Sequence, residues 1–293
     1  MLTAFDDYLI HQTPEPVAHP GTGDRNFYDR HFFNGFSREG DLFFGAALGL
    51  YPNRRVMDAA FTLVRDGRQL SVHASRLAPA ERGETRVGPI AIEVVEALRT
   101  LRVRVAPNDF GLEADLLFRA RGPALEEPRF TARVENRLFM DTTRLTQFGL
   151  WEGTITAGSV LRLGDGAVEP VAAVAHRVRW QPGTRRAAAA EIILTPHRGG
   201  RLEISLEPLL TAQMCGLGYL HPEWGHGMWK GELAVGGESW PLADLDPMEP
   251  RHLHVQQVCR ARLGERQGIG VLEQLVLGPH LPSGFTSILD PAA

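Results

Sequence analysis

The sequence of 293 residues contains only two cysteines, Cys215 and Cys259, and neither stands in a CxxC pair. This scarcity argues against a disulfide framework or a cysteine zinc site and favours two buried thiols in a reducing compartment. No apolar run reaches the roughly 20 residues that a membrane helix requires. The acidic start, MLTAFDDYLIHQTPEP, is unlike a secretory signal. We therefore expect a cytoplasmic protein with no membrane span.

Motifs of several common enzyme classes are also missing. The sequence has no GxSxG nucleophile elbow, no GxxxxGK[ST] loop and no GxGxxG after a strand pattern. The formal net charge of -4 gives no general attraction to nucleic acid. Hydrophobic residues make up 43% and charged residues 23%, which is typical of a folded chain. We expect neither a cofactor nor a nucleic-acid partner.

What the sequence does contain is a period-two alternation of apolar and polar residues, as in LRVRVAP, GLEADLLFRAR and RLEISLEP. Side chains of a strand point alternately to opposite faces, so this pattern predicts antiparallel sheets with one dry and one wet side. In RQLSVHAS the expected dry face holds Leu70, Val72 and Ala74, and the expected wet face holds Ser71, His73 and Ser75.

Dipeptides that contain glycine separate several of these runs. Asp66-Gly67, Gly199-Gly200 and Gly236-Gly237 each predict a two-residue hairpin turn, and Gly264 predicts another. Short helices are expected only in residues 3–10 and near 243–247. The sequence therefore predicts an all-β fold of barrels or sandwiches with few short helices.

The stretch HPEWGHGMWKGELAVGGESWPL gathers histidine, glutamate and tryptophan around glycines. His221, Glu223 and His226 are candidate metal ligands, which His252 or His254 could complete. The intervening proline and glycines exclude the helix on which metalloprotease ligands lie, so we expect no metal.

The same stretch also suggests the rim of a pocket. Trp224, Met228, Trp229 and Trp240 offer apolar surface beside acid or base groups. A well-packed strand entry is the alternative, in which glycine allows close backbone approach.

Two further segments carry candidate residues. The first, residues 26–45, contains Tyr28, His31, Phe33, Asn34 and Phe44. These residues could line an aromatic cavity or form a core strand pair.

The stretch FMDTTRLTQFGLWEG holds Asp141 near Arg144 and Trp151. An Asp141 desolvated among aromatic rings would have a raised pKa and could donate a proton. An ordinary Asp141–Arg144 ion pair is the alternative.

Several of these stretches carry a family resemblance. DRNFYDRHFFNGFSREGDLFFGAALGLYPNRRVMDAAF, RLTQFGLWEG and HVQQVCRARLGERQGIGVLEQLVLGPHLPSGF resemble a bacterial family of mostly uncharacterised proteins. That family is distantly similar to lipocalin-like carotenoid 1,2-hydratase (hydroxyneurosporene synthase) and AttH-type proteins. The resemblance implies two consecutive lipocalin-like β domains, residues 1–170 and 171–293, with a cavity for an isoprenoid, steroid or polyketide.

Together these observations predict a protein that binds a lipophilic small molecule in an apolar β cavity. The alternative is a cofactor-free hydratase, isomerase or cyclase that uses acid catalysis. An edge strand near LEQLVLG would allow pairing between copies, so a homo-oligomer stays open. The candidate catalytic residues are Asp141, Glu223 and His226, and the candidate ligand-binding residues are Tyr28, His31, Phe33, Asn34, Phe44, Trp151, Trp224 and Trp229.

Overall fold

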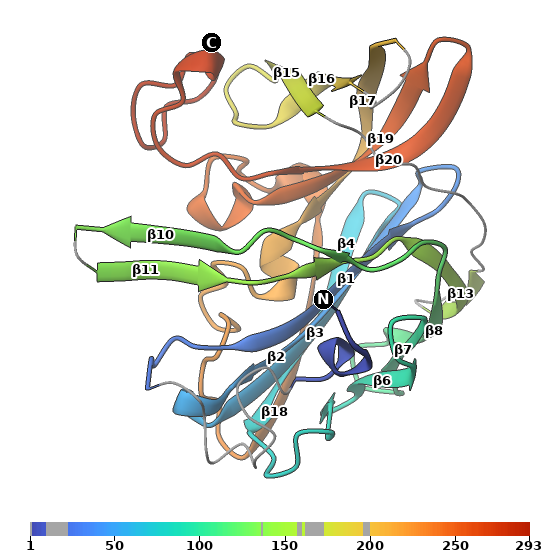
Figure 1. Ribbon diagram of the computed structural model, residues 1–293, viewed down its shortest axis with the longest axis vertical. Helices are drawn as coiled ribbons and strands as arrows, with labels where there is room; N and C mark the ends of the chain where they lie inside the picture. Colours follow the sequence, from blue (N-terminus) through green and yellow to red (C-terminus); the bar gives the residue numbers. More distant parts are fainter. Residues whose placement is uncertain (1, 10–22, 136, 157–159, 162–172, 196–199) are drawn as a thin grey trace.

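The computed structural model describes residues 2–9, 23–135, 137–156, 160–161, 173–195 and 200–293, and these residues form an all-β fold (Figure 1). The helical segments are single 3-10 turns: η1 (Ala4–Asp7), η2 (Pro52–Arg54), η3 (Met214–Leu217), η4 (Leu242–Asp244), η5 (Pro250–His252) and η6 (Leu281–Ser283). η1 and η4 lie where short helices were expected, near residues 3–10 and 243–247, whereas η2, η3, η5 and η6 were not expected. Within the described part of the chain, no helix is long and apolar enough to cross a bilayer.

Three antiparallel sheets make up most of the molecule. The first has the order β1-β2-β3-β4-β18 and comprises β1 (Asp29–Phe36), β2 (Leu42–Tyr51), β3 (Val56–Arg65), β4 (Arg68–Leu77) and β18 (Leu233–Pro241). The second has the order β14-β13-β8-β7-β6-β5 and comprises β5 (Arg86–Val87), β6 (Ile90–Glu96), β7 (Thr100–Val105), β8 (Glu113–Ala120), β13 (Gly149–Thr156) and β14 (Val160–Leu161). The third has the order β15-β16-β17-β19-β20 and comprises β15 (Ala173–Trp180), β16 (Ala187–Thr195), β17 (Leu202–Gln213), β19 (Val255–Leu263) and β20 (Arg266–Gln274).

Two short pairs complete the described strands. β10 (Phe130–Val134) pairs with β11 (Arg137–Thr142), and β9 (Leu125–Glu126) pairs with β12 (Leu145–Thr146). The β10–β11 hairpin projects from the body of the molecule (Figure 1). Of the two expected architectures, the described strands form open, sandwich-like layers and no closed barrel.

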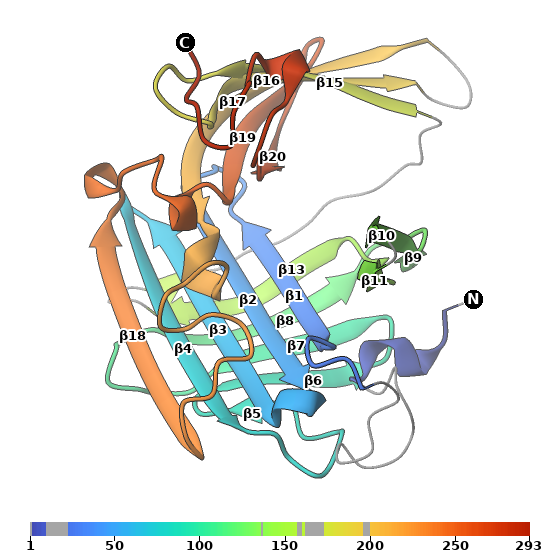
Figure 2. The same cartoon turned by 90° about the vertical axis from the view of Figure 1, so that its left-hand side faces the viewer.

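The first and second sheets pack face to face, with the strands of the second crossing behind those of the first (Figure 2). Their facing side chains form one apolar core, in which Phe44, Leu48 and Phe61 meet Val103 and Leu116. All five of these side chains are fully buried. This core accounts for the apolar half of the period-two pattern, because every second residue of β2, β3 and β4 points toward it.

The opposite face of the first sheet is also buried, which corrects the expectation of a wet face on β4. Ser71, His73 and Ser75 are at most 2% exposed. The covering structure comes from far along the chain: η3 and residues 218–231, hereafter the covering segment, run across β2, β3 and β4 (Figure 2). Alternation identified the two faces correctly, but it cannot reveal that a distant segment shields the polar one.

The predicted turns have mixed outcomes. Asp66-Gly67 and Gly264 form the β3–β4 and β19–β20 turns with positive φ angles, as expected. Gly199 lies outside the described residues. Gly236-Gly237 is not a turn, because both glycines lie inside β18 and pair with His73 and Val72 of β4. A Cβ at Gly236 would lie 2.2 Å from the Trp224 ring, so glycine serves close packing there.

The expected domain boundary at residue 170 lies outside the described residues. β18, from the C-terminal side of that boundary, nevertheless belongs to the first sheet. The two sides are also joined by paired hydrogen bonds: the Gln69 side chain donates to the Gln213 carbonyl and accepts from the Gln213 N–H.

The C-terminal residues are bound to the third sheet through Arg185. The Arg185 guanidinium is 1% exposed and donates to the carbonyl oxygens of Val276, Gly278, Ser287 and Asp290. It also donates to the Asp290 carboxylate at 2.6 Å. One buried cation therefore holds residues 276–290 against the sheet. The two cysteines are free and buried, as predicted.

Candidate functional site

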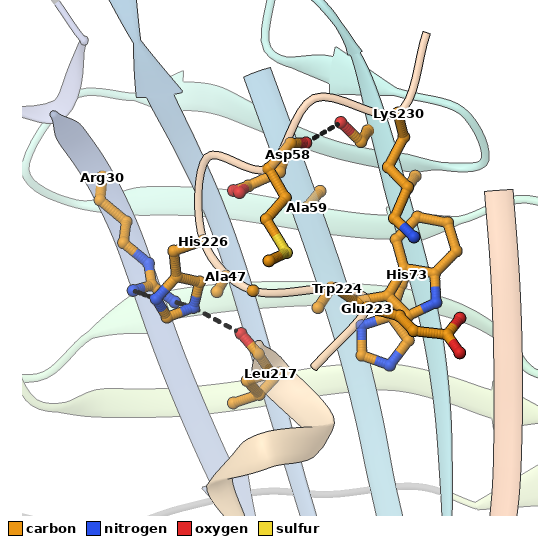
Figure 3. Close-up of a pocket in the computed structure, with 15 residues that line it drawn as sticks. Arg30, Ala47, Asp58, Ala59, His73, Leu217, Glu223, Trp224, His226 and Lys230 are labelled. Atoms are coloured by element: carbon orange, nitrogen blue, oxygen red, sulfur yellow. Dashed lines mark hydrogen bonds between the residues drawn. The ribbon is translucent and has the colours of Figure 1, made fainter. Parts of the chain in front are cut away.

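A pocket lies between the polar face of the first sheet and the covering segment (Figure 3). Its floor is built largely from alanine, including Ala47 of β2 and Ala60 of β3, because larger side chains would leave no room. The space that remains enclosed is about 10 Å³, roughly what one water molecule needs. The polar and aromatic groups around it are Arg30, Asp58, His73 and Ser75 from the sheet, and Glu223, Trp224, His226 and Lys230 from the covering segment, which also contributes the apolar Met228.

Glycines allow the covering segment to lie close to the sheet. Gly227 has a φ of +68°, which favours glycine, and a Cβ there would lie 2.9 Å from the Tyr51 ring. Trp224 lies over Gly236 and stacks on His73, with ring centroids 5.6 Å apart and an angle of 11° between the planes. The roof of the pocket thus depends on small residues at matched positions below it.

Beside the pocket, the Glu238 carboxylate of β18 contacts two buried imidazoles. His73 Nε2 lies 2.9 Å from Glu238 Oε1, and His221 Nε2 lies 3.1 Å from both carboxylate oxygens. These three side chains form a cluster whose ligand atoms all lie within 4.8 Å of one another. Two histidines and a carboxylate form a set that binds zinc or iron in other proteins.

The hydrogen bonds of His221 argue against a metal in this cluster. Its Nδ1 atom accepts the backbone N–H groups of Glu223 and Trp224, at 3.1 and 2.9 Å. Nδ1 therefore carries the lone pair, so the proton of the neutral ring lies on Nε2 and is donated to Glu238. A metal-binding histidine has the reverse arrangement, with the metal on one nitrogen and a donated N–H on the other.

The charges of the cluster follow from these bonds. Burial alone would raise the pKa of Glu238, but the hydrogen bonds from His221 and His73 outweigh it and lower the pKa to about 2. Burial lowers the pKa of His73. The cluster is thus an ionised carboxylate held by neutral imidazole N–H donors, and it fixes β18, β4 and the covering segment to one another.

The pKa of Asp58, in β3, is shifted in the opposite direction to that of Glu238. Its carboxylate accepts the Gly227 N–H at 2.6 Å. Burial raises the pKa of Asp58 to about 6, and the lowering effects of the Gly227 bond and of the Arg30 charge are smaller. Asp58 can therefore exist as a neutral acid close to physiological pH.

Arg30 and His226 form the other side of the pocket. The Arg30 Nη1 and Nη2 atoms lie 3.2 and 2.8 Å from His226 Nδ1 and Nε2, and His226 Nε2 lies 2.8 Å from the Leu217 carbonyl oxygen. The carbonyl requires a proton on Nε2, so Nδ1 accepts from Arg30. Burial and the Arg30 charge lower the pKa of His226 to about 3.

Three of the predicted site residues meet in this pocket: Glu223, Trp224 and His226. His226, predicted as catalytic, is a neutral acceptor next to an arginine. Trp229 is 54% exposed and does not line the pocket.

The aromatic residues predicted to surround a ligand lie elsewhere. Phe33 and Phe44 each contact the Trp151 ring edge to face, with centroid distances of 5.7 Å and 5.2 Å. All three belong to the core between the first and second sheets, or pack against it. This arrangement corresponds to the alternative of a core strand pair.

The remaining N-terminal candidates are also separate from the pocket lining. Tyr28 is 48% exposed and packs against Tyr51. His31 Nε2 lies 2.7 Å from the Asp7 carbonyl oxygen. Asn34 donates to the Gln256 side chain and accepts the Trp151 indole N–H through its backbone carbonyl.

Asp141 lacks the raised pKa that its predicted role as a proton donor requires. Its carboxylate lies on the projecting β11 strand and accepts two hydrogen bonds from Arg129, at 2.6 and 2.5 Å. This contact lowers the pKa of Asp141, whereas a proton donor requires a raised one. The alternative Asp141–Arg144 pair is also wrong, because Arg144 pairs with Glu127.

Among the site residues that sequence reasoning missed are Arg30, Asp58, His73 and Glu238. The sequence predicted a wet strand face for His73, and Glu238 directly follows the Gly236-Gly237 pair that was predicted to form a turn. One available signal was the recurrence of alanine and glycine in GAALG and GG, since small residues on a strand face indicate a closely approaching partner.

The chain was compared with known proteins. Residues 2–163 and 161–286 match a family described as a family of unknown function (DUF8625). This chain belongs to that family. Searches of curated proteins and of solved structures gave no match. The description of this family assigns no activity to its members.

Proposed function

We propose that the pocket under the covering segment binds a lipophilic small molecule. The observation that carries this proposal is the combination of an alanine floor with apolar walls from Leu217, Trp224 and Met228. Ligand sites are typically apolar concavities with a few polar groups that orient the ligand. Here Asp58 and Arg30 are such groups.

The covering segment must move for a ligand of any size to enter, because the enclosed space is about 10 Å³. Two features support such movement. Gly218, Gly227 and Gly231 have φ angles of +93°, +68° and +100°. Met228 and Trp229 are 42% and 54% exposed, so the outer surface of the segment already offers apolar contacts.

Native mass spectrometry of protein recovered from a lipid-containing extract tests this proposal. The wild-type protein should carry a hydrophobic molecule, and Trp224→Ala should lose it. Trp229→Ala is the matched control, because it removes the same side chain from a position outside the pocket and should retain the molecule. Equal retention by both variants would place the ligand elsewhere, and an empty wild-type protein would argue against the proposal.

A second candidate, acid catalysis without a cofactor, is favoured by one specific observation. Asp58 lines the pocket and has a pKa raised to about 6. A carboxyl group kept partly neutral near pH 7 can protonate an alkene, an enol or an epoxide. We propose Asp58 in place of Asp141 for this role. The sequence resemblance to carotenoid 1,2-hydratases fits such chemistry but does not select a reaction.

Turnover of the co-purified molecule tests this second candidate. Asp58→Asn should abolish turnover and leave the molecule bound, since asparagine can still accept the Gly227 N–H. Asp141→Asn should have no effect, because Asp141 lies on a projecting hairpin. Unchanged turnover in Asp58→Asn would exclude Asp58 as the acid.

A further inference from the structure

Arg30 is a cation that forms no ion pair within the described residues. Its guanidinium donates through Nη1 to Nδ1 of the neutral His226 ring, while the Nε2 proton of that ring goes to the Leu217 carbonyl. The Arg30 Nε atom is buried and makes no hydrogen bond within the described residues. By contrast, Arg102, Arg129 and Arg185 each contact a carboxylate within 2.7 Å. A partly buried charge without a counterion is unfavourable unless another group compensates it.

Arg30 and Asp58 both line the pocket. In the first sheet Arg30 is directly opposite Gly49, and Gly49 is opposite Asp58. The Tyr51 ring fills the position that a side chain at Gly49 would take. The Tyr219 ring lies against the guanidinium, with a distance of 4.8 Å from the Arg30 Cζ atom to the ring centroid. Aromatic packing orients the guanidinium but contributes no formal charge.

The titratable groups near Arg30 include one acid, Asp58, which is largely ionised at pH 7 because its pKa is about 6. Within the described structure, Asp58 makes no direct contact with the guanidinium. His226 is neutral because its pKa is lowered to about 3. Burial raises the pKa of Tyr219 and of Tyr51, so both phenols are neutral. The pocket lining holds one further charge of each sign: Lys230, which lies 4.7 Å from the Trp224 ring centroid, and Glu223.

We propose that Arg30 binds an anionic group of the ligand, such as a carboxylate, so that the natural ligand is an amphipathic anion rather than a neutral hydrocarbon. The guanidinium would hold the charged end, and the alanine floor with Leu217, Trp224 and Met228 would contact the apolar remainder. This inference rests on the proposed function, because it assigns a charge to the molecule that the pocket binds.

The test compares two probes that share one chain length, 1-octanesulfonate and 1-octanol. The sulfonate stays ionised at every pH of interest, so its own titration does not enter. Isothermal titration calorimetry at pH 7 and low ionic strength should show that wild-type protein binds 1-octanesulfonate about tenfold more tightly than 1-octanol, since a charge-assisted hydrogen bond contributes roughly that factor. Arg30→Gln should abolish the preference while binding 1-octanol within about twofold of wild type, and Arg30→Lys should restore part of it.

Arg104→Gln is the matched control, because Arg104 is an exposed arginine of the second sheet, with 52% of its side chain accessible. It should keep the wild-type preference. A measurement on the wild-type protein guards against a folding defect in the Arg30 variants. Binding of 1-octanesulfonate should raise the pKa of His226, observed by NMR of its ring, because the anion cancels the Arg30 charge that lowers it.

The outcomes separate this inference from the proposed function. Equal affinity of wild-type protein for both probes, or a preference that survives in Arg30→Gln, would overturn the anion site but keep the pocket. Binding of neither probe would overturn both proposals. A sulfonate preference that depends on Arg30 and shifts the His226 pKa would support the anion site.

Discussion

His221 Nε2 lies 3.1 Å from the carboxylate of Glu238, and the direction of that hydrogen bond is set by two backbone N–H groups on the other ring nitrogen. A cluster of two histidines and one carboxylate is therefore a hydrogen-bonded brace rather than a vacant metal centre. It joins a strand, its neighbour and the covering segment at one point beside the pocket.

The first prediction concerns zinc. Because His221 Nδ1 accepts N–H groups, its Nε2 must keep a proton and cannot offer a lone pair to a metal. One equivalent of Zn²⁺ should leave the Tm unchanged, and ¹⁵N NMR of His221 should show the Nε2–H tautomer. Submicromolar zinc binding that disappears in His73→Ala would contradict this assignment.

The second prediction concerns Glu238. Its folded pKa of about 2 lies below its ordinary value of 4.5, so its stabilising effect is present above pH 4.5 and is lost as the pH falls toward 2. Glu238→Gln should lower the free energy of unfolding at pH 7 by about 2–3 kcal/mol, after allowance for its partial exposure. Urea unfolding at pH 7 and pH 3 measures this, and the loss should be smaller at pH 3. An equal loss at both pH values would show that the charge is not responsible.

The third prediction concerns Asp58, whose pKa is raised by folding, whereas that of Glu238 is lowered. Its folded pKa of about 6 exceeds its ordinary value of 3.8, so ionisation costs stability as the pH rises from about 4 to 6. Asp58→Asn should therefore be more stable than wild type at pH 7.5 by about 1–2 kcal/mol, and nearly equal to it at pH 4. Urea unfolding curves at the two pH values check this. A variant less stable than wild type at pH 7.5 would refute the raised pKa.

The fourth prediction concerns the buried cation of the third sheet. Arg185→Ala removes the donor for four carbonyl groups and the Asp290 carboxylate. We expect a loss of about 3–5 kcal/mol and faster proteolysis of residues 276–290. Arg177→Ala, which breaks an exposed pair with Glu191, should cost about 1 kcal/mol or less. Similar losses in the two variants would mean that the tail is not held by Arg185.

The fifth prediction concerns the roof of the pocket. An added Cβ at Gly236 would lie 2.2 Å from the Trp224 ring, so Gly236→Ala should displace Trp224 and destabilise the protein by about 1–3 kcal/mol. Gly268→Ala, in β20, meets no atom within 4 Å and should be neutral or slightly stabilising. Thermal unfolding and Trp fluorescence compare the two. An unchanged emission spectrum in Gly236→Ala would show that the contact is not tight.

The all-β class and much of the hairpin pattern could be predicted from the sequence, because strand periodicity and turn chemistry are local properties. Asp66-Gly67 illustrates this, since its positive φ angles are encoded by the two residues themselves. The Gly236-Gly237 pair shows the limit. Its local chemistry is that of a turn, but the rings of Trp224 and Phe110 occupy the space that side chains would fill.

The site was harder to predict because its members are distant in sequence. His221, Glu223 and His226 are close along the chain, yet His221 joins His73 and Glu238 while His226 joins Arg30. The burial that raises the pKa of Asp58 also comes from the covering segment, about 170 residues away. Periodicity assigns a residue to a face but does not tell what lies on that face.

The place of β18 in the first sheet has a consequence for synthesis on the ribosome. His73 and Glu238 are 165 residues apart, so the edge of β4 stays unpaired until most of the chain has been translated. A contact between residues so far apart has a high entropic cost of loop closure. Until it forms, the unpaired edge of β4 can hydrogen-bond to strands of other nascent chains. Chaperone demand during translation should therefore fall only once residues 233–241 have emerged.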